Sequence, residues 1–162
     1  MFKVCIITVS DKGSKGERED KSGEVIRTLM EDTGYQVITK VILPDEVKLL
    51  EEQMIEWADN STCDLILTTG GTGFSPRDFT PEATKAVIDR EVPGIPEAMR
   101  AYSLTITKKA MLSRAAAGIR KQTLIINLPG SPKAVKETLE YILPPLYHGL
   151  EIMTGKTGEC AR

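Results

Sequence analysis

An apolar run leads directly into a cluster of glycines at Asp64-Leu65-Ile66-Leu67-Thr68-Thr69-Gly70-Gly71-Thr72-Gly73. An unbroken apolar run is typical of a strand that is covered on both faces, as in a parallel sheet. Downstream, Thr80-Pro81-Glu82 combines a capping hydroxyl, a proline and an acid, a pattern that predicts the start of a helix. Together these segments predict the strand–loop–helix unit of an α/β protein.

The same alternation of apolar runs and amphipathic segments continues along the chain. Further strands are expected at residues 4–9, 35–43, 115–118 and 123–127. Strands that alternate with helices favour an α/β fold, here a three-layer α/β/α sandwich with a mostly parallel central sheet. The two strands around Arg120-Lys121-Gln122 are expected to add an antiparallel pair.

Particular side chains are expected to define the helix ends. Ser22, Asp45 and Thr80 are candidate N-caps, because a side-chain oxygen at that position accepts a backbone N–H of the first turn. Gly34 is expected to end the helix that begins at Ser22. The pair Pro144-Pro145 is expected to break the last helix, since proline lacks the N–H that a helix interior needs.

Length and composition indicate a single domain over residues 1–162. The chain is 41% hydrophobic and 27% charged, which is typical of a compact globular protein. Its formal net charge of −2 argues against a nucleic-acid partner. Since no apolar run approaches the roughly 20 residues of a membrane span, and the first residues lead into a strand, we expect a cytoplasmic protein without a membrane partner.

The three cysteines, Cys5, Cys63 and Cys160, lie far apart in the sequence. Their odd number and wide spacing match neither a disulfide framework nor a paired metal motif. We expect them to be dispensable for the chemistry of the protein.

Three polar loops are expected at the carboxyl ends of strands, where ligands of α/β sheets gather. They begin at Ser10-Asp11, at Gly70 and at Asn127. Gly70 to Gly73 allow a ligand to approach the backbone closely, and the following helix start favours a phosphate. The alternative is a tight strand-to-helix turn with no ligand, and the glycine spacing rules out the dinucleotide fingerprint.

Acids and other polar groups surround these loops. Asp11, Asp45 and Asp78 follow strand ends, where they could hold Mg²⁺ together with substrate phosphates or could merely cap helices. Asp78 stands two residues before Thr80, the more obvious cap, so its carboxylate is expected to be available. Ser113-Arg114 could supply further anion contacts.

The glycine segment carries a resemblance to a known family. Residues 69–83, from Thr69 through Gly73 and Asp78 to Ala83, closely resemble the signature of the molybdopterin adenylyltransferases of the MogA/MoaB type, whose fold also occurs in gephyrin and in a plant relative. Further matching stretches are 10–12, 20–23, 43–46, 112–114 and 127–132, in the order of the family and covering nearly the whole chain.

The resemblance implies Mg²⁺-dependent transfer of AMP from ATP to the terminal phosphate of molybdopterin, with release of pyrophosphate. It implies that Asp45 and Asp78 are the catalytic acids and the candidate Mg²⁺ ligands. It also implies a homotrimer and a downstream molybdenum insertase as a partner. The substrate-binding residues implied for molybdopterin and ATP are Ser10, Asp11, Gly70, Gly71, Thr72, Gly73, Ser113, Arg114, Asn127, Pro129, Gly130 and Ser131.

Two alternative functions stay open at the level of sequence. One is a protein that binds and delivers molybdopterin without turnover. The other is a nucleotide-pyrophosphate hydrolase. Pyrophosphate release that requires both ATP and molybdopterin would separate the transferase from both.

Overall fold

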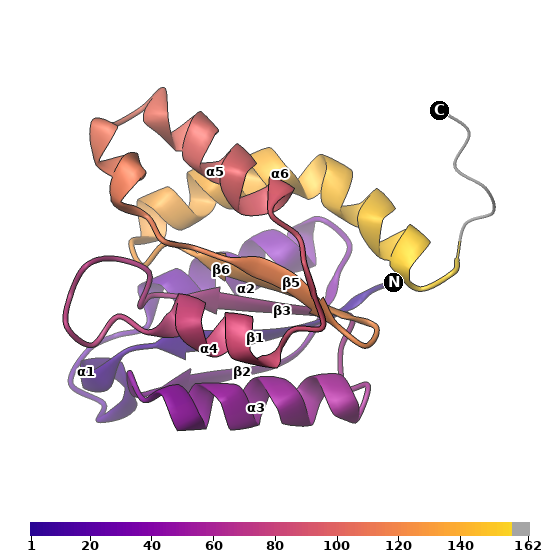
Figure 1. The fold of residues 1–162 in the computed structure, drawn as a ribbon, viewed down its shortest axis with the longest axis horizontal. Helices are drawn as coiled ribbons and strands as arrows, with labels where there is room; N and C mark the ends of the chain where they lie inside the picture. The colour runs from indigo at the N-terminus through magenta and orange to yellow at the C-terminus, as the bar shows by residue number, and fades with distance from the viewer. Residues whose placement is uncertain (157–162) are drawn as a thin grey trace.

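A six-stranded sheet lies at the centre of the computed structural model, which describes residues 1–156 (Figure 1). The strands are β1 (Lys3–Val9), β2 (Gln36–Leu43), β3 (Leu65–Thr69), β4 (Arg90–Glu91), β5 (Ala117–Arg120) and β6 (Thr123–Leu128). The helices are α1 (Asp11–Ser14), α2 (Lys21–Asp32), α3 (Val47–Asp59), α4 (Thr80–Val87), α5 (Gly94–Leu104) and α6 (Pro132–Met153), with a 3₁₀ helix at Lys108–Leu112.

The order of the strands in the sheet is β2-β1-β3-β6-β5-β4. Strands β2, β1, β3 and β6 are parallel, whereas β5 runs antiparallel to β6 and β4 antiparallel to β5. The chain leaves β1 toward one edge of the sheet and later returns to β3 on the other side of β1. The sheet therefore has a topological switch point between β1 and β3, and ligands of open α/β sheets bind at such points.

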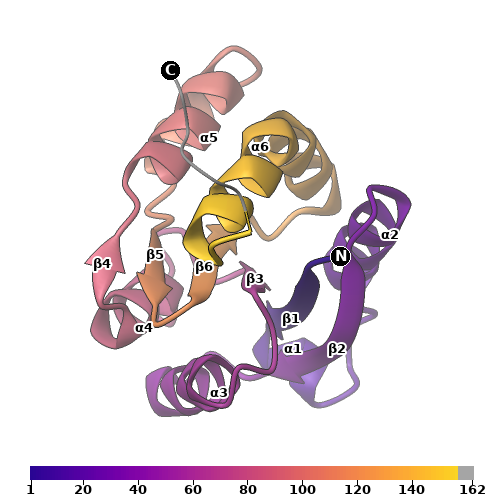
Figure 2. The same ribbon diagram turned by 90° about the vertical axis from the view of Figure 1, so that its right-hand side faces the viewer.

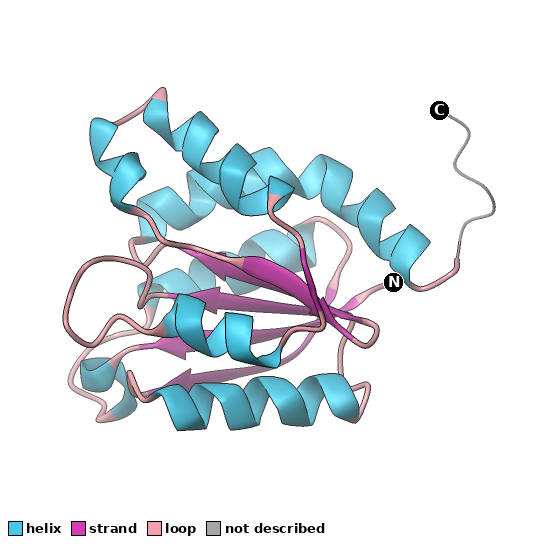
Figure 3. Ribbon diagram, viewed as in Figure 1, coloured by secondary structure: helices cyan, strands magenta, loops and turns pink. Residues whose placement is uncertain are grey.

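Helices cover both faces of the sheet (Figures 2 and 3). Alternate residues of β1 point to opposite faces, so Val4 and Ile6 pack in one core cluster while Cys5 and Ile7 pack in the other. The first cluster includes side chains of α2, α5 and α6, and the second includes side chains of α3 and α4. This arrangement confirms the predicted α/β sandwich with a mostly parallel sheet.

The structure corrects all three predicted N-caps. Helix α2 is capped by Asp20, whose carboxylate accepts the N–H of Gly23, so Ser22 lies inside the helix. Glu46 precedes α3 without a side-chain cap, and the Asp45 carboxylate is engaged elsewhere. Thr80 is the first residue of α4, and its hydroxyl donates to the Gly70 carbonyl.

The predicted break in the last helix is also wrong. Helix α6 continues through Pro144 and Pro145 as far as Met153. Proline weakens a helix interior, but Leu143 and Leu146 on either side are buried in the core. Tertiary packing of these side chains outweighs the local preference of the two prolines.

No helix among residues 1–156 has both the length and the apolar composition needed to cross a membrane. Cys5 and Cys63 are buried free thiols away from the polar strand ends, and Cys160 lies outside the described residues.

Candidate active site

The carboxyl ends of the four parallel strands meet at one edge of the sheet. Ser10 and Asp11 follow β1, and Asp45 follows β2. The loop from Gly70 to Asp78, which we call the glycine loop, follows β3, and Pro129 to Ser131 follow β6. Because parallel strands end at the same edge, segments far apart in the sequence come together there.

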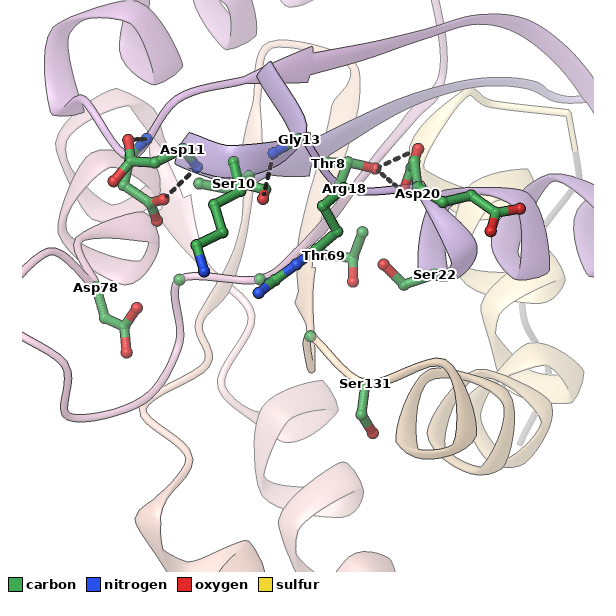
Figure 4. Close-up of a pocket in the computed structure, with 17 residues that line it drawn as sticks. Thr8, Ser10, Asp11, Gly13, Arg18, Asp20, Ser22, Thr69, Asp78 and Ser131 are labelled. Carbon is green, nitrogen blue, oxygen red and sulfur yellow. Dashed lines mark hydrogen bonds between the residues drawn. The ribbon is translucent and has the colours of Figure 1, made fainter. Parts of the chain in front are cut away.

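A cavity of about 540 Å³ opens at this edge (Figure 4). We call it the acidic cavity, because five carboxylate side chains line it, those of Asp11, Glu19, Asp20, Asp45 and Asp78. Eight residues that the sequence had singled out line it, namely Ser10, Asp11, Asp45, Gly70, Gly71, Asp78, Gly130 and Ser131.

Asp11 and Asp45 tie the ends of β1 and β2 together by reciprocal hydrogen bonds. The Asp45 carboxylate accepts the Asp11 N–H at 3.0 Å, and the Asp11 carboxylate accepts the Asp45 N–H at 3.0 Å. The Asp11 carboxylate also receives two hydrogen bonds from the Arg77 guanidinium, at 2.7 and 2.9 Å. Arg77 thereby links the glycine loop to the end of β1.

The two linked acids differ in their electrostatic surroundings. The hydrogen bond from Arg77 lowers the pKa of Asp11. Burial raises the pKa of Asp45, and the nearby negative charges of Asp11 and Asp78 raise it further. Asp45 is therefore a partly buried carboxylate next to like charges, a condition that a bound cation would relieve.

The Asp78 carboxylate, which the sequence led us to expect to be available, is partly engaged within its own loop. It accepts the Ser75 N–H at 3.0 Å, so it closes a short turn within the loop and is not wholly free. A Cβ built on Gly73 would lie 3.1 Å from the same carboxylate. The side chain lines the acidic cavity together with Asp45.

Two of the loop glycines stand where no residue with a side chain would fit. Gly70 and Gly71 adopt φ of 97° and 71°, in the left-handed region that favours glycine. A Cβ on Gly70 would lie 2.5 Å from the Val9 carbonyl oxygen, and one on Gly71 would lie 2.2 Å from Thr80 Oγ1. Close packing against β1 and α4 therefore requires glycine at both positions.

Arg114 also fixes the glycine loop, through hydrogen bonds to its backbone carbonyls. Its guanidinium donates to the carbonyls of Gly73 and Asp78, at 2.9 and 2.6 Å, and pairs with Glu82. Its backbone N–H donates to the carbonyl of Thr72. Arg114 does not line either cavity, so its observed contacts position the loop, and the anion contact stays a prediction.

A second cavity, of about 290 Å³, is lined by Thr72 and Gly73 of the glycine loop but not by Asp45. We call it the apolar cavity, because Met99, Ile106 and Leu112 contribute to its wall. Four further residues singled out from the sequence line this cavity and not the acidic one, namely Thr72, Gly73, Ser113 and Pro129. The glycine loop thus contributes to the walls of both cavities.

Asn127 was predicted to be a substrate-binding residue, but it does not line either cavity. Its side chain is fully buried and donates to the hydroxyls of Thr68 and Thr84 at 3.1 and 2.8 Å. Its side-chain carbonyl oxygen accepts the Ala116 N–H at 3.1 Å. Asn127 therefore joins β3, α4 and the approach to β5 beneath the site.

Sequence reasoning missed several residues of the acidic cavity. Thr8 donates to both carboxylate oxygens of Asp20 at 2.9 Å, and Lys40 pairs with Asp20 at 2.7 Å. Lys12 and Arg18 supply the two cationic side chains of the cavity. The stretch of polar residues after β1 was the available signal, but only the folded chain shows which of its members face inward.

The donor set fits Mg²⁺ that is held together with a substrate. Among residues 1–156 no group of three or more His, Cys, Asp or Glu side chains is arranged to hold a metal ion. Mg²⁺ is commonly bound by one or two carboxylates, with substrate phosphates and water as its other ligands. Asp45 and Asp78 could supply those carboxylates, and the raised pKa of Asp45 agrees with this role.

Comparison with known proteins adds independent findings. A family model described as a probable molybdopterin binding domain matches residues 5–148. A molybdopterin adenylyltransferase of Helicobacter pylori strain J99 is 42% identical over 94% of this chain and 88% of its own, and that of Escherichia coli K12 is 45% identical over 86% and 72%. The crystal structure of the molybdopterin biosynthesis enzyme MoaB from Thermus thermophilus is 50% identical, with a TM-score of 0.91 over 98% of this chain and 100% of its own.

Proposed function

Because the chain belongs to the family of probable molybdopterin binding domains, we propose that it is a molybdopterin adenylyltransferase. It would transfer AMP from ATP to the terminal phosphate of molybdopterin. The observation that best supports this reaction is the glycine loop, whose residues line both the acidic cavity and the apolar cavity. A transferase that joins two substrates needs such adjoining sites.

The properties of the cavities suggest which substrate each one holds. The acidic cavity offers the carboxylates of Asp45 and Asp78, which suit the metal-bound phosphates of ATP. The apolar cavity offers Met99, Ile106 and Leu112 for the pterin ring, with Ser113 as a polar contact. The reacting phosphates would then meet at the glycine loop.

The reaction forms one bond and breaks one at the same phosphorus atom. A phosphate oxygen of molybdopterin attacks the α-phosphorus of ATP, and the bond from that phosphorus to the bridging β-phosphate oxygen breaks. Pyrophosphate leaves with the electron pair of the broken bond. Little covalent chemistry is required of the protein, so positioning and charge stabilisation dominate the rate.

The residues of the chain would hold this arrangement in place. Gly71 lines the acidic cavity and could donate its backbone N–H to a phosphate, whereas the Gly70 N–H already donates to the Leu128 carbonyl. Arg77 and Arg114 fix the loop that carries Asp78. Asp45 and Asp78 would hold Mg²⁺, which when bound neutralises phosphate charge at the reacting centre.

The decisive experiment measures pyrophosphate release with each substrate alone and with both together. The transferase requires both ATP and molybdopterin, whereas a pyrophosphate hydrolase releases product from the nucleotide alone. A protein that binds molybdopterin without any release would be a carrier. Either of those results would overturn the proposal.

Two variants test the acids in the same assay. Asp78→Asn keeps an acceptor for the Ser75 N–H but removes the charge, so the fold should persist while adenylyl transfer falls about 100-fold or more. Asp45→Asn should behave in the same way. Asp32→Asn is the matched control, because Asp32 is exposed at the end of α2 farther from the acidic cavity. Normal transfer by either site variant would exclude that acid from the chemistry.

We also propose that the chain acts as a single cytoplasmic domain assembled as a homotrimer, and that a molybdenum insertase accepts its product. These features rest on the family resemblance. Light scattering that gives the 17.8 kDa mass of one chain at micromolar concentration would overturn the trimer.

A further inference from the structure

Most cationic side chains around the acidic cavity are already engaged. Arg77 pairs with Asp11, Arg114 pairs with Glu82 and binds two loop carbonyls, and Lys40 pairs with Asp20 and Glu24. These three groups hold the walls of the site together. None of them can turn toward a ligand without giving up its present partners.

Arg18 differs from them, because no described residue pairs with it. It lies on the segment between α1 and α2, and its side chain is exposed. Within residues 1–156 its guanidinium makes no ion pair or hydrogen bond, although Glu17 and Glu19 are its neighbours in sequence. Figure 4 shows the side chain extending toward the middle of the acidic cavity.

The position of Arg18 also joins two cavities. A groove of about 450 Å³ continues from the acidic cavity toward the start of α6. Arg18, Glu19, Ser22 and Gly130 line both spaces. A ligand that extends from the acidic cavity into this groove would pass the Arg18 guanidinium.

The excess of carboxylates in the acidic cavity means that an anionic ligand needs the positive charge of Arg18. Among residues 1–156, five carboxylates and two cationic side chains, those of Lys12 and Arg18, line the acidic cavity. A polyanionic substrate needs positive groups there in addition to any metal ion that Asp45 and Asp78 hold. A guanidinium suits this task, since its planar fork donates two parallel hydrogen bonds to a phosphate.

We propose that Arg18 is a substrate-binding residue whose unpaired guanidinium takes a phosphate group of one of the two substrates. This inference rests on the proposed function and adds a residue to it. ATP and molybdopterin both carry phosphate, and the experiment below distinguishes the two sources. Loss of the contact should weaken binding of that substrate about 10-fold or more, the effect of one charge-assisted hydrogen bond.

The experiment measures the affinity of each substrate separately by calorimetry, with ATP and Mg²⁺ in one arm and molybdopterin under anaerobic conditions in the other. The variants are Arg18→Gln, which removes the charge, and Arg18→Lys, which keeps the charge but not the fork. Arg90→Gln is the matched control, because Arg90 is exposed on β4 at the opposite edge of the sheet from β2. Melting curves are recorded for every variant.

We expect Arg18→Gln to weaken one substrate and to melt as the wild type does. Arg18→Lys should recover part of the affinity, and Arg90→Gln should change neither affinity. An active wild type whose two affinities are unaffected by Arg18→Gln overturns this inference alone, as does a loss that accompanies a lower melting temperature. A wild type that forms no product from ATP and molybdopterin overturns the proposed function and this inference with it.

Discussion

Replacing Asn127 with alanine is expected to destabilise the protein without weakening its binding of either substrate. The side chain is fully buried and makes three hydrogen bonds, two as a donor to Thr68 and Thr84 and one as an acceptor from Ala116. Alanine removes all three and leaves the Ala116 N–H buried without its partner. The two hydroxyls lose an interaction as well, but a hydroxyl can rotate toward other acceptors.

The magnitude follows from these contacts. An unsatisfied buried N–H costs about 1 to 3 kcal/mol, and each net hydrogen bond contributes about 1 kcal/mol. Allowing for re-pairing of the hydroxyls, we expect a loss of about 3 kcal/mol in the free energy of unfolding. For a domain of this size each kcal/mol lowers the melting temperature by about 2 to 4 °C, so the expected shift is about 6 to 12 °C.

Thermal unfolding and the affinities for ATP and for molybdopterin are measured on the same preparation. Asn60→Ala is the control, since Asn60 is exposed at the end of α3 and should melt as the wild type does. The reasoning is refuted by an Asn127→Ala protein that melts normally but binds ATP or molybdopterin weakly. That result would return Asn127 to the substrate contacts that the sequence suggested.

Three further predictions concern a glycine, an acid and a thiol. Gly71→Ala should unfold at a lower temperature and lose transfer activity, because its Cβ would lie 2.2 Å from Thr80 Oγ1, whereas Gly94→Ala meets nothing within 4 Å and should be tolerated in the same melting and activity assays. Burial and neighbouring negative charge raise the pKa of Asp45 above its ordinary value of 3.8. The folded protein therefore binds more protons than the unfolded chain just above that pH, and its stability falls as the pH rises through this window. Melting curves should show Asp45→Asn gaining more over the wild type at about pH 7 than at about pH 3, and an equal difference at both would contradict the pKa shift. A hydrogen bond with the buried Cys5 thiol, together with burial, raises the pKa of Cys63. The Cys63 thiol should therefore react with iodoacetamide only as the protein unfolds, and the Cys63→Ser variant should keep its transfer activity.

The fold was predictable because its central strands can be identified from their own local sequence. The runs at β1, β3 and β6 are nearly all buried, and their apolar sequence shows it directly. Strand β4 was missed because its two residues, Arg90 and Glu91, are exposed and carry no apolar alternation. Helix α1 was missed for a similar reason, since only Gly13 of its four residues is buried.

Two of the predicted caps, Asp45 and Thr80, failed because their side chains bond to other loops, and Ser22 failed because Asp20 caps α2 two positions earlier. Asp45 is bonded to Asp11, which lies 34 positions away. The Asp20 carboxylate caps α2 and is also held by Thr8 of β1, so this acid is fixed from two elements at once. Local capping rules describe which atoms could form hydrogen bonds, but the arrangement of the strands in the sheet determines which of those atoms lie close together.

The loops of the candidate site were predictable for a topological reason. Parallel strands bring their following loops to one edge whatever the loop residues are, and the switch point between β1 and β3 fixes where a cavity opens. The division of the residues between two cavities was not predictable, because it depends on how the loop turns at Gly70 and Gly71.

The pairing of charges explains why this site needs its arginines as much as its acids. Asp11, Asp45 and Asp78 meet at one edge, and burial together with the negative charges of Asp11 and Asp78 raises the pKa of Asp45. Arg77 neutralises Asp11 and ties it to the loop, and Arg114 holds the loop from behind without facing either cavity. Asp11 is thus paired with Arg77, whereas Asp45 and Asp78 line the cavity without an ion-pair partner among residues 1–156. A loop rich in glycine would otherwise be free to move, and these two contacts hold Asp78 opposite Asp45 before any substrate arrives.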